Sequence, residues 1–310
     1  MQNRLAKNVL QSINSITMSL LDYLPKDGAP VNSHLSQKLD AHFVDVTKKL
    51  PFPPVAISIG EHTIKGNTYP TPFGTYGNFS AIVGPSKSKK TFLKSLLLSR
   101  YLGGNSNIFS TSIKGHNQNK IVVDIDTEQS LWHSQNVFKR VSEMVGSTEN
   151  YKPYSLRSLG HTERLELIEF LIYESEFRND IGVIAIDGIA DLIQDFNNLV
   201  ECEMVVQKLM KWTSERNIHI ITIIHQNSTT SKATGHLGSF ILKKAETVCN
   251  VKNVEESVNV TFNYTRGYPI SEFQFQINSD GYPYISGEQL AMIEEPVSLQ
   301  PNTNFETEPF

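Results

Sequence analysis

Short apolar runs alternate along this chain with segments whose apolar positions repeat at helical spacing. From residue 55 onward this alternation predicts an α/β fold with a mainly parallel sheet, right-handed crossovers and flanking helices. Several runs are apolar at nearly every position, as expected for strands that are covered on both faces. The predicted strands are Ser80–Val83, Lys120–Ile125, Val183–Ile186, Ile218–Ile224, Thr247–Val251, Val258–Tyr264 and Phe273–Ile277. The last two, with the turn Gly281-Tyr282-Pro283, indicate a C-terminal antiparallel hairpin at the sheet edge.

A helical extension is predicted ahead of this domain. Residues 4–24 place eight apolar side chains largely on one helical face, and a breaker follows at Pro25–Pro30. The eight are Leu5, Val9, Leu10, Ile13, Ile16, Leu20, Leu21 and Leu24. A second helical stretch near Leu35–Leu50 leads to the extended boundary Pro51–Pro54. We expect an extension over residues 1–50 and a main domain over 51–287; the first helix docks on its own chain or on a neighbouring subunit.

Composition narrows the class of protein. The chain has 310 residues, 39% apolar and 19% charged, with a formal net charge of −4, which predicts a globular protein rather than a strongly basic nucleic-acid coat. Any contact with nucleic acid then requires a local patch or an assembled ring. Cys202 and Cys249 fit neither a metal pattern nor a disulfide framework, so we expect buried thiols in a reducing compartment. No apolar run or signal-peptide pattern indicates a membrane, and we expect a cytoplasmic protein.

The segment 288–310 is acidic and has no lysine or arginine. Its acids are Glu288, Glu294, Glu295, Glu306 and Glu308. This composition predicts a disordered tail. Its end, Phe305–Phe310, resembles the acidic tips by which single-strand binding proteins recruit partners, and a plain solvated end is the alternative.

The most informative motif is Gly-Pro-Ser-Lys-Ser-Lys-Lys-Thr at residues 84–91. It lies between the apolar run Phe79–Val83 and a predicted helix, Phe92–Tyr101, and so has the strand–loop–helix setting of a phosphate-binding loop. The predicted nucleotide ligands are Gly84, Pro85, Ser86, Lys87, Ser88, Lys89, Lys90 and Thr91. Lys90 is assigned to the β- and γ-phosphates of ATP, Thr91 to Mg²⁺, and the amides of residues 87–90 to a phosphate cradle.

Lys89 stands where the motif usually has its second glycine. Lysine fits this position if its φ is ordinary and its side chain points outward, and that is the conformation we expect. Lys87 and Lys89 either add positive charge near the phosphates or are solvated loop lysines.

Two further predicted strands end in acids. Asp187 ends an apolar strand and is the predicted Mg²⁺-side carboxylate. Glu128 follows another strand and is the candidate base that orients and deprotonates the attacking water. Asp126 is an alternative candidate for the base. Asp124 either points to the same face of the strand as Asp126 or is turned away, depending on where the alternation of the strand stops. These acids alternatively only cap the helix from Gln129 onward.

Polar residues after the strand Ile218–Ile224 suggest a γ-phosphate sensor, either Gln226 or His225, although His225 also suits a buried structural role. The small, polar segment 228–239 is suited to grip the phosphates of single-stranded DNA, or is an ordinary surface connection. Its candidate DNA contacts are Lys232, Thr234, Gly235 and His236. Arg266 ends a late strand, where its guanidinium could reach the γ-phosphate of a neighbouring subunit.

Together these motifs resemble the RecA-like P-loop ATPases over residues 52–285. Within them the chain is most similar to RepA- and DnaB-type hexameric helicases, including RepA-like ATPases of Bacteroidetes phages and mobile elements. The similarity rests on Ile186–Leu192, Thr234–Ser239 and Lys244–Val248. It implies Lys90 and Thr91 as nucleotide ligands, Asp187 as the Mg²⁺-linked acid, Glu128 as base, Gln226 as sensor and Arg266 as a finger acting in trans.

Three positions depart from the family pattern. Lys89 replaces a glycine, Thr234 stands where relatives often have arginine, and Tyr264 lies where many DnaB-type proteins have lysine. The first expectation is an oligomeric, Mg²⁺-dependent ATPase, a hexamer by resemblance, that moves on or remodels single-stranded DNA as a replicative helicase does. A recombinase or recombination mediator on the same core is the second. A nucleotide-gated DNA-binding regulator with little hydrolysis is the third.

Overall fold

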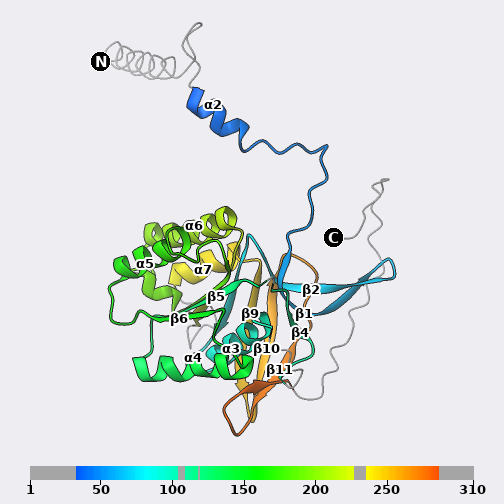
Figure 1. Ribbon diagram of the computed structural model, residues 1–310, viewed down its shortest axis with the longest axis vertical. Helices are drawn as coiled ribbons and strands as arrows, with labels where there is room; N and C mark the ends of the chain where they lie inside the picture. The colour runs from blue at the N-terminus through cyan, green and yellow to red at the C-terminus, as the bar shows by residue number, and fades with distance from the viewer. Residues whose placement is uncertain (1–32, 104–108, 118, 227–234, 286–310) are drawn as a thin grey trace, which may run out of the picture. The chain divides into compact units, whose positions relative to one another are not determined.

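The computed structural model describes residues 33–103, 109–117, 119–226 and 235–285 (Figure 1). The predicted helix at 4–24 and the acidic tail from 288 lie outside the described residues. The chain divides into two compact units, Met1–Pro51 and Phe52–Phe310.

The described part of the first unit contains one short helix, α2 (Ser33–Asp40). The prediction that this helix continues to Leu50 is wrong, because the chain leaves helical geometry after Asp40. Two features of the following residues oppose a helix. Val44 and Val46 are β-branched, and the carboxylate of Asp45 accepts a hydrogen bond of 3.0 Å from the backbone N–H of Thr47. Such local side-chain hydrogen bonds compete with helical ones.

The second unit is built on a nine-stranded sheet in the order β12-β11-β10-β9-β3-β8-β7-β5-β6. The six strands from β9 to β6 are parallel, and β10, β11 and β12 add antiparallel pairs at one edge. This confirms the predicted α/β class with a C-terminal antiparallel edge. The strands are β3 (Phe79–Gly84), β5 (Ile121–Asp126), β6 (Tyr151–Ser155), β7 (Ile181–Asp187), β8 (His219–His225), β9 (Thr247–Val254), β10 (Ser257–Thr265), β11 (Phe273–Ile277) and β12 (Pro283–Tyr284).

Helices cover both faces of this sheet (Figure 1). On one face α3 and α4 pack into an apolar core, and on the other face α5, α6 and α7 pack into a second core. The helices are α3 (Lys90–Tyr101), α4 (Leu131–Val145), α5 (His161–Tyr173), α6 (Leu199–Arg216) and α7 (Gly235–Lys244), with a 3-10 turn η1 (Ile189–Leu192). Cys202 and Cys249 are buried free thiols, as predicted. Among the helices described, none combines the length and apolarity needed to cross a membrane.

A separate three-stranded sheet, in the order β2-β1-β4, was not predicted. It consists of β1 (Val55–Ile64), β2 (Asn67–Thr75) and β4 (Ile113–Gly115). The sequence signal is weak because β2 contains Pro70 and Pro72, and proline cannot donate to a strand ladder. Both prolines are tolerated because β2 is an edge strand. The edge strand β6, which contains Pro153, was missed for the same reason.

The parallel register brings the candidate residues together at the carboxyl ends of the central strands. Gly84 at the end of β3 is level with His225 at the end of β8. Asp126 at the end of β5 is likewise level with Asp187 at the end of β7. The carboxyl ends of four adjacent or near-adjacent strands therefore converge, which is where open α/β sheets bind ligands.

Candidate active site

The candidate phosphate loop leaves β3 at a glycine that allows close packing. A Cβ atom on Gly84 would lie 2.4 Å from the carbonyl oxygen of Val251 and 2.6 Å from Oγ of Ser88, so no larger residue fits without a shift. The Ser88 hydroxyl is buried, and it has no hydrogen-bond partner within the described part of the chain. A buried hydroxyl without a partner is unfavourable, and an anionic ligand in the loop would supply an acceptor.

Lys89 does not have the ordinary φ that we expected. Its φ is 71°, in the left-handed region, and Lys87 has a φ of 62°. The loop therefore keeps a backbone shape typical of glycine with lysine in place, at a cost of about 1–2 kcal/mol for such a residue. The Lys89 side chain is exposed, as expected, and its Nζ lies 5.2 Å from the ring centroid of Phe92.

Lys90 folds back over the loop. Its ammonium donates to the carbonyl oxygens of Gly84 at 2.9 Å and Pro85 at 2.8 Å, and it lies 3.1 Å from Nδ1 of His225. Burial lowers the pKa of Lys90, although the charges of Asp187 and Glu128 oppose that shift. The three donors of this lysine are thus directed into the loop and toward the end of β8.

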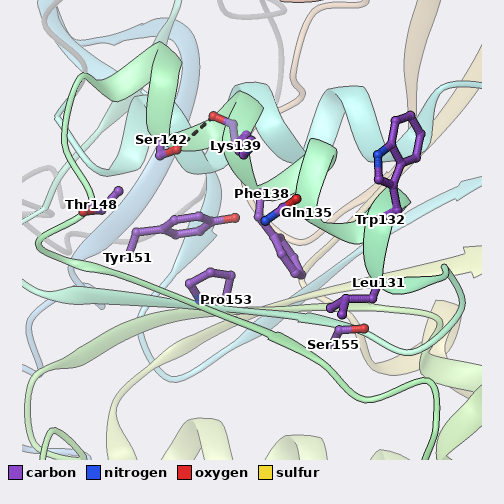
Figure 2. Close-up of a pocket in the computed structure, with 10 residues that line it drawn as sticks. All are labelled: Leu131, Trp132, Gln135, Phe138, Lys139, Ser142, Thr148, Tyr151, Pro153 and Ser155. Atoms are coloured by element: carbon purple, nitrogen blue, oxygen red, sulfur yellow. Dashed lines mark hydrogen bonds between the residues drawn. The ribbon is translucent and has the colours of Figure 1, made fainter.

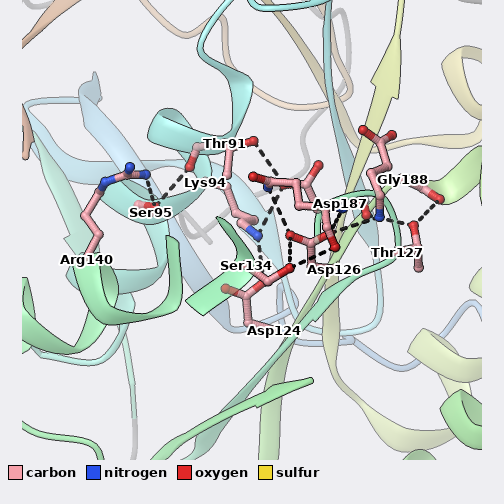
Figure 3. Close-up of polar contacts among 12 residues, drawn as sticks. Thr91, Lys94, Ser95, Asp124, Asp126, Thr127, Ser134, Arg140, Asp187 and Gly188 are labelled. Carbon is pink, nitrogen blue, oxygen red and sulfur yellow. Dashed lines mark hydrogen bonds and ion pairs between the residues drawn. The ribbon is translucent and has the colours of Figure 1, made fainter. Parts of the chain in front are cut away.

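Thr91 and Asp187, the two residues assigned to Mg²⁺ from the sequence, are in contact (Figure 3). The Thr91 hydroxyl donates to Oδ2 of Asp187 at 3.1 Å. The same Oδ2 lies 3.3 Å from Nζ of Lys94, whose side chain is fully buried. Burial raises the pKa of Asp187 and outweighs the opposing charge of Lys94.

The three acids around β5 have different environments. Asp126 accepts hydrogen bonds from the backbone N–H groups of Glu128 and Gln129 at 2.9 and 2.8 Å. Its other oxygen accepts from the Ser134 hydroxyl at 3.0 Å (Figure 3). The same oxygen accepts from the Gln129 side-chain amide, also at 3.0 Å. Asp126 thus fits the capping alternative rather than a base.

Asp124 is also committed to structural contacts. It accepts from Nζ of Lys94 at 2.8 Å and from the hydroxyl of Tyr151 at 2.6 Å, and it is fully buried. Of the three acids only Glu128 has a partly exposed carboxylate, with 34% of its side chain accessible. This leaves Glu128 as the acid best placed to meet a ligand.

Glu128 and His225 form a pair at the mouth of the site. Nε2 of His225 lies 3.1 Å from each carboxylate oxygen of Glu128. If the Lys90 ammonium donates to Nδ1, the ring proton is on Nε2 and is donated to Glu128. Burial favours the neutral form of Glu128, but the His225 hydrogen bond and the charges of Lys90 and Lys94 outweigh it and lower its pKa.

A second set of contacts, which sequence reasoning missed, holds the ends of β5 and β7 together. The Thr127 hydroxyl lies 2.9 Å from the carbonyl oxygen of Asp187 and 2.8 Å from Oδ2 of Asp191. Gly188 has a φ of 101°, and a Cβ there would lie 2.2 Å from Oγ1 of Thr127 and 2.7 Å from Cγ of Glu128. The sequence signal for this set of contacts is Gly188, the glycine directly after Asp187.

Lys94 was also missed. Its sequence signal is a lysine one helical turn after Lys90, inside a largely apolar run that becomes α3. A lysine at such a position is rarely buried unless it is paired, and here both partners are acids of core strands, Asp124 in β5 and Asp187 at the end of β7.

A groove of about 710 Å³ lies between α4 and β6 (Figure 2). Trp132, Phe138 and Pro153 line it together with the ring of Tyr151. Tyr151 connects this groove to Asp124 through the hydrogen bond described above.

The predicted sensor Gln226 and the candidate DNA contacts lie after the end of β8 in the sequence. The backbone N–H of Gln226 donates to the carbonyl oxygen of Gly84 at 2.9 Å, which places the residue beside the phosphate loop. Gly235 and His236 begin α7. Lys232 and Thr234 lie outside the described residues.

Arg266 lies at the amino-terminal end of the parallel strands, whereas the phosphate loop lies at their carboxyl end. It follows Thr265, which pairs with Thr247, and Thr247 pairs in turn with Ser80 near the start of β3. The loop begins four residues farther along β3, about 13 Å at strand spacing. The Arg266 guanidinium is exposed and donates to the carbonyl oxygen of Lys244 at 2.8 Å. Arg266 is therefore not brought together with Lys90 within one chain.

The donor set fits Mg²⁺. Thr91 and Asp187 offer a hydroxyl and a carboxylate, the oxygen donors that Mg²⁺ prefers, and a bound nucleotide supplies further oxygens. Across the described ranges there is no cluster of three or more His, Cys, Asp or Glu residues that could hold a metal alone. A metal at this site would thus be shared with phosphate oxygens rather than enclosed by protein.

The chain was compared with known proteins at the level of sequence and of structure. No protein-family model matches the sequence, and no curated protein matches it. A crystal structure of the RadB recombinase is similar, with a TM-score of 0.46 and 15% sequence identity over 68% of this chain and 91% of that chain.

Proposed function

We propose that this chain is a RecA-like, Mg²⁺-dependent ATPase that assembles into a homo-oligomer in the cytoplasm and acts on single-stranded DNA. One observation carries the proposal. A glycine-initiated loop with Lys90 and Thr91 meets Asp187 and Glu128 at the carboxyl ends of neighbouring parallel strands. Binding of ATP phosphates uses backbone donors, a lysine and an oxygen pair for Mg²⁺, and hydrolysis uses a base for the attacking water.

Each side chain then has a role that follows from its contacts. Lys90 exchanges the carbonyl oxygens of Gly84 and Pro85 for phosphate oxygens. Thr91 and Asp187 would hold Mg²⁺, which supplies positive charge against the phosphates when bound. Glu128 accepts a proton from the attacking water as the bond between the γ-phosphorus and the bridging oxygen breaks.

The γ-phosphate sensor is proposed to act through the end of β8. His225 contacts both Lys90 and Glu128, and Gln226 follows it beside Gly84. A phosphate that draws Lys90 away from His225 changes the partners of this ring. That change would pass to Gln226 and to the segment 228–239, which we propose as the DNA contact.

Arg266 is proposed to act on the site of a neighbouring subunit. Arg266 lies at the amino-terminal end of the parallel strands, and the phosphate loop lies at their carboxyl end. This position supports the role, because a head-to-tail contact places the amino-terminal end of the sheet in one copy against the carboxyl end in the next. Oligomerisation is thus part of the proposed catalytic site rather than an addition to it.

The test is steady-state ATP hydrolysis with and without single-stranded DNA, using Lys90→Ala as the control for contaminating ATPases. Stimulation by DNA that disappears in the variant supports a DNA-coupled motor. Nucleotide binding with no turnover in either condition would contradict the ATPase and favour a nucleotide-gated regulator. For an active protein, unwinding of a forked duplex supports a helicase, whereas an ATP-stabilised filament without unwinding supports a recombinase.

A further inference from the structure

A buried positive charge lies beneath the proposed metal position. Nζ of Lys94 is 2.8 Å from Oδ1 of Asp124 and 3.3 Å from Oδ2 of Asp187. The lysine and Asp124 are fully buried, and the Asp187 side chain is 6% exposed. Lys94 therefore neutralises one of two adjacent carboxylates and leaves the group with a single net negative charge.

Lys94 is held in this place from several sides. The Tyr151 hydroxyl donates to Asp124 at 2.6 Å and fixes the carboxylate that faces the ammonium. The ring of Phe138 lies 5.9 Å from Nζ. Burial alone would lower the pKa of Lys94, but the charges of Asp124 and Asp187 reverse the shift and raise it. Lys94 is thus a fixed cation and not a mobile surface lysine.

The contact with Asp187 gives this cation a consequence for the metal. Oδ2 of Asp187 is the atom shared by Lys94 and Thr91. A divalent ion that approaches Thr91 and Asp187 meets a carboxylate whose negative charge Lys94 already offsets in part, and the ion is repelled by Lys94 itself. Phosphate oxygens of a nucleotide would restore the negative charge that the ion needs.

We propose that Lys94 is an internal counter-cation that makes divalent-cation binding at Thr91 and Asp187 conditional on bound nucleotide. The inference rests on the proposed nucleotide site and adds a regulation of that site. Without nucleotide, the ammonium takes the place of a metal as the partner of Asp187. With nucleotide, the phosphates supply the additional charge and the divalent ion binds.

The test uses Mn²⁺ as the probe, with free Mn²⁺ followed by electron paramagnetic resonance. Lys94→Met removes the charge but keeps a long side chain. We expect this variant, without nucleotide, to bind one Mn²⁺ at least about tenfold more tightly than the wild type, a difference of about 1.4 kcal/mol. An affinity equal to that of the wild type would overturn the proposal.

A charge-matched control separates the charge from the shape of the site. The double variant Lys94→Met/Asp124→Asn loses one positive and one negative charge and keeps the net charge of the wild-type group. We expect its nucleotide-free Mn²⁺ affinity to return toward the wild-type value. If the double variant binds Mn²⁺ as tightly as Lys94→Met does, loosened packing and not charge is responsible, and the proposal is wrong.

A second variant, which shifts the charge in the opposite direction, keeps the proposal testable if Lys94→Met does not fold. Loss of the lysine leaves two buried carboxylates without a cationic partner, which is strongly destabilising. Asp124→Asn leaves the Lys94 charge fully directed at Asp187. With ADP bound, its Mn²⁺ affinity is expected to fall by about tenfold on the scale of one unit charge at short range. An unchanged or higher affinity contradicts the inference. Tyr151→Phe, which changes no charge, is the matched control.

The experiment also distinguishes this inference from the proposed function. A fluorescent ATP analogue titrated into the wild type tests nucleotide binding directly, and no binding would overturn the ATPase. Nucleotide binding together with equal Mn²⁺ affinities in the wild type and Lys94→Met would overturn only the role of Lys94.

Discussion

Nε2 of His225 lies 3.1 Å from both carboxylate oxygens of Glu128, while Nδ1 of the same ring lies 3.1 Å from Nζ of Lys90. One imidazole therefore connects the lysine of the phosphate loop to the acid proposed as the base. These three residues come from different segments of the chain: Lys90 begins α3, Glu128 follows β5, and His225 ends β8. Their contact arises from the parallel strand order, and it links occupation of the loop to the environment of the acid.

The first prediction concerns Glu128. In Glu128→Gln the carboxylate that accepts the proton is lost, whereas the contacts of Lys90 with its loop remain. ATP binding is expected to be retained and turnover to fall by at least about a hundredfold, the scale of a removed general base. The measurements are nucleotide affinity by fluorescence and steady-state hydrolysis. Turnover equal to that of the wild type would eliminate Glu128 as the base.

The second prediction follows from the pKa of Glu128, which His225 helps to lower. His225→Phe removes that hydrogen bond, so the pKa of Glu128 should rise. Because the base must be ionised, the acidic limb of the kcat/KM profile should move to higher pH. His225→Gln retains a donor, and a smaller movement is expected. Coincident acidic limbs in the wild type and the Phe variant would argue against the coupling.

The sequence predicted the main sheet better than its surroundings. Strands that are covered on both faces leave a run of apolar residues, and each of these was recognised. The strands β2 and β6 contain prolines, and their edge positions make those prolines acceptable only in the folded chain. The end of α2 at Asp40 depends on local hydrogen bonds around Asp45 that a periodicity pattern does not contain.

For the candidate site, the residues at strand ends could be predicted from the sequence, but their hydrogen-bond and ion-pair partners could not. Glu128 was preferred from its position after β5, and the structure shows why its neighbours differ from it: Asp126 is a cap and Asp124 is paired with Lys94. The pair of Asp124 and Lys94 joins residues thirty positions apart, and both contacts depend on side-chain direction. The left-handed φ of Lys89 is likewise a property of the folded loop.

The third prediction uses that φ. Lys89→Gly relieves a left-handed backbone and should raise the free energy of unfolding by about 1 kcal/mol. Lys89→Ala removes the same side chain but keeps the strain, so no gain is expected. Urea denaturation of both variants provides the measurement. Equal gains would point to the lysine side chain rather than to the backbone.

The fourth prediction concerns stability and pH. His219 is fully buried, donates from Nδ1 to the carbonyl oxygen of Thr75 at 3.0 Å, and has its pKa lowered to about 4 by burial. The unfolded chain therefore binds this proton first as pH falls. The stabilisation is complete above about pH 6.5, the ordinary pKa of histidine, and is lost between there and about pH 4, by about 3 kcal/mol.

Urea denaturation at several pH values between 7.5 and 4.5 measures this loss. His219→Phe has no titrating group at the position and should show a shallower decline, since only the carboxylates and the other histidines then contribute. Identical slopes in the two proteins would show that His219 does not titrate as its burial requires.

The fifth prediction tests whether Arg266 acts between subunits. Lys90→Ala removes the lysine of a subunit's own site, and Arg266→Ala removes the group proposed to complete the neighbour's site. Each variant alone should have little DNA-stimulated ATPase activity. In a mixture, a site is complete where an Arg266→Ala subunit, with its Lys90 intact, meets the Arg266 of a Lys90→Ala subunit.

Random assembly of equal amounts makes about one quarter of the sites complete, if contacts are head to tail. Activity in the mixture should therefore rise above that of either variant and approach this fraction of the wild-type rate at most. A mixture that is no more active than its components would contradict action in trans, provided that the two variants co-assemble in a pull-down with differently tagged subunits. The activity of the mixture decides between action in trans and no role at the site, because the register of β3, β9 and β10 places Arg266 out of reach of Lys90 in its own chain.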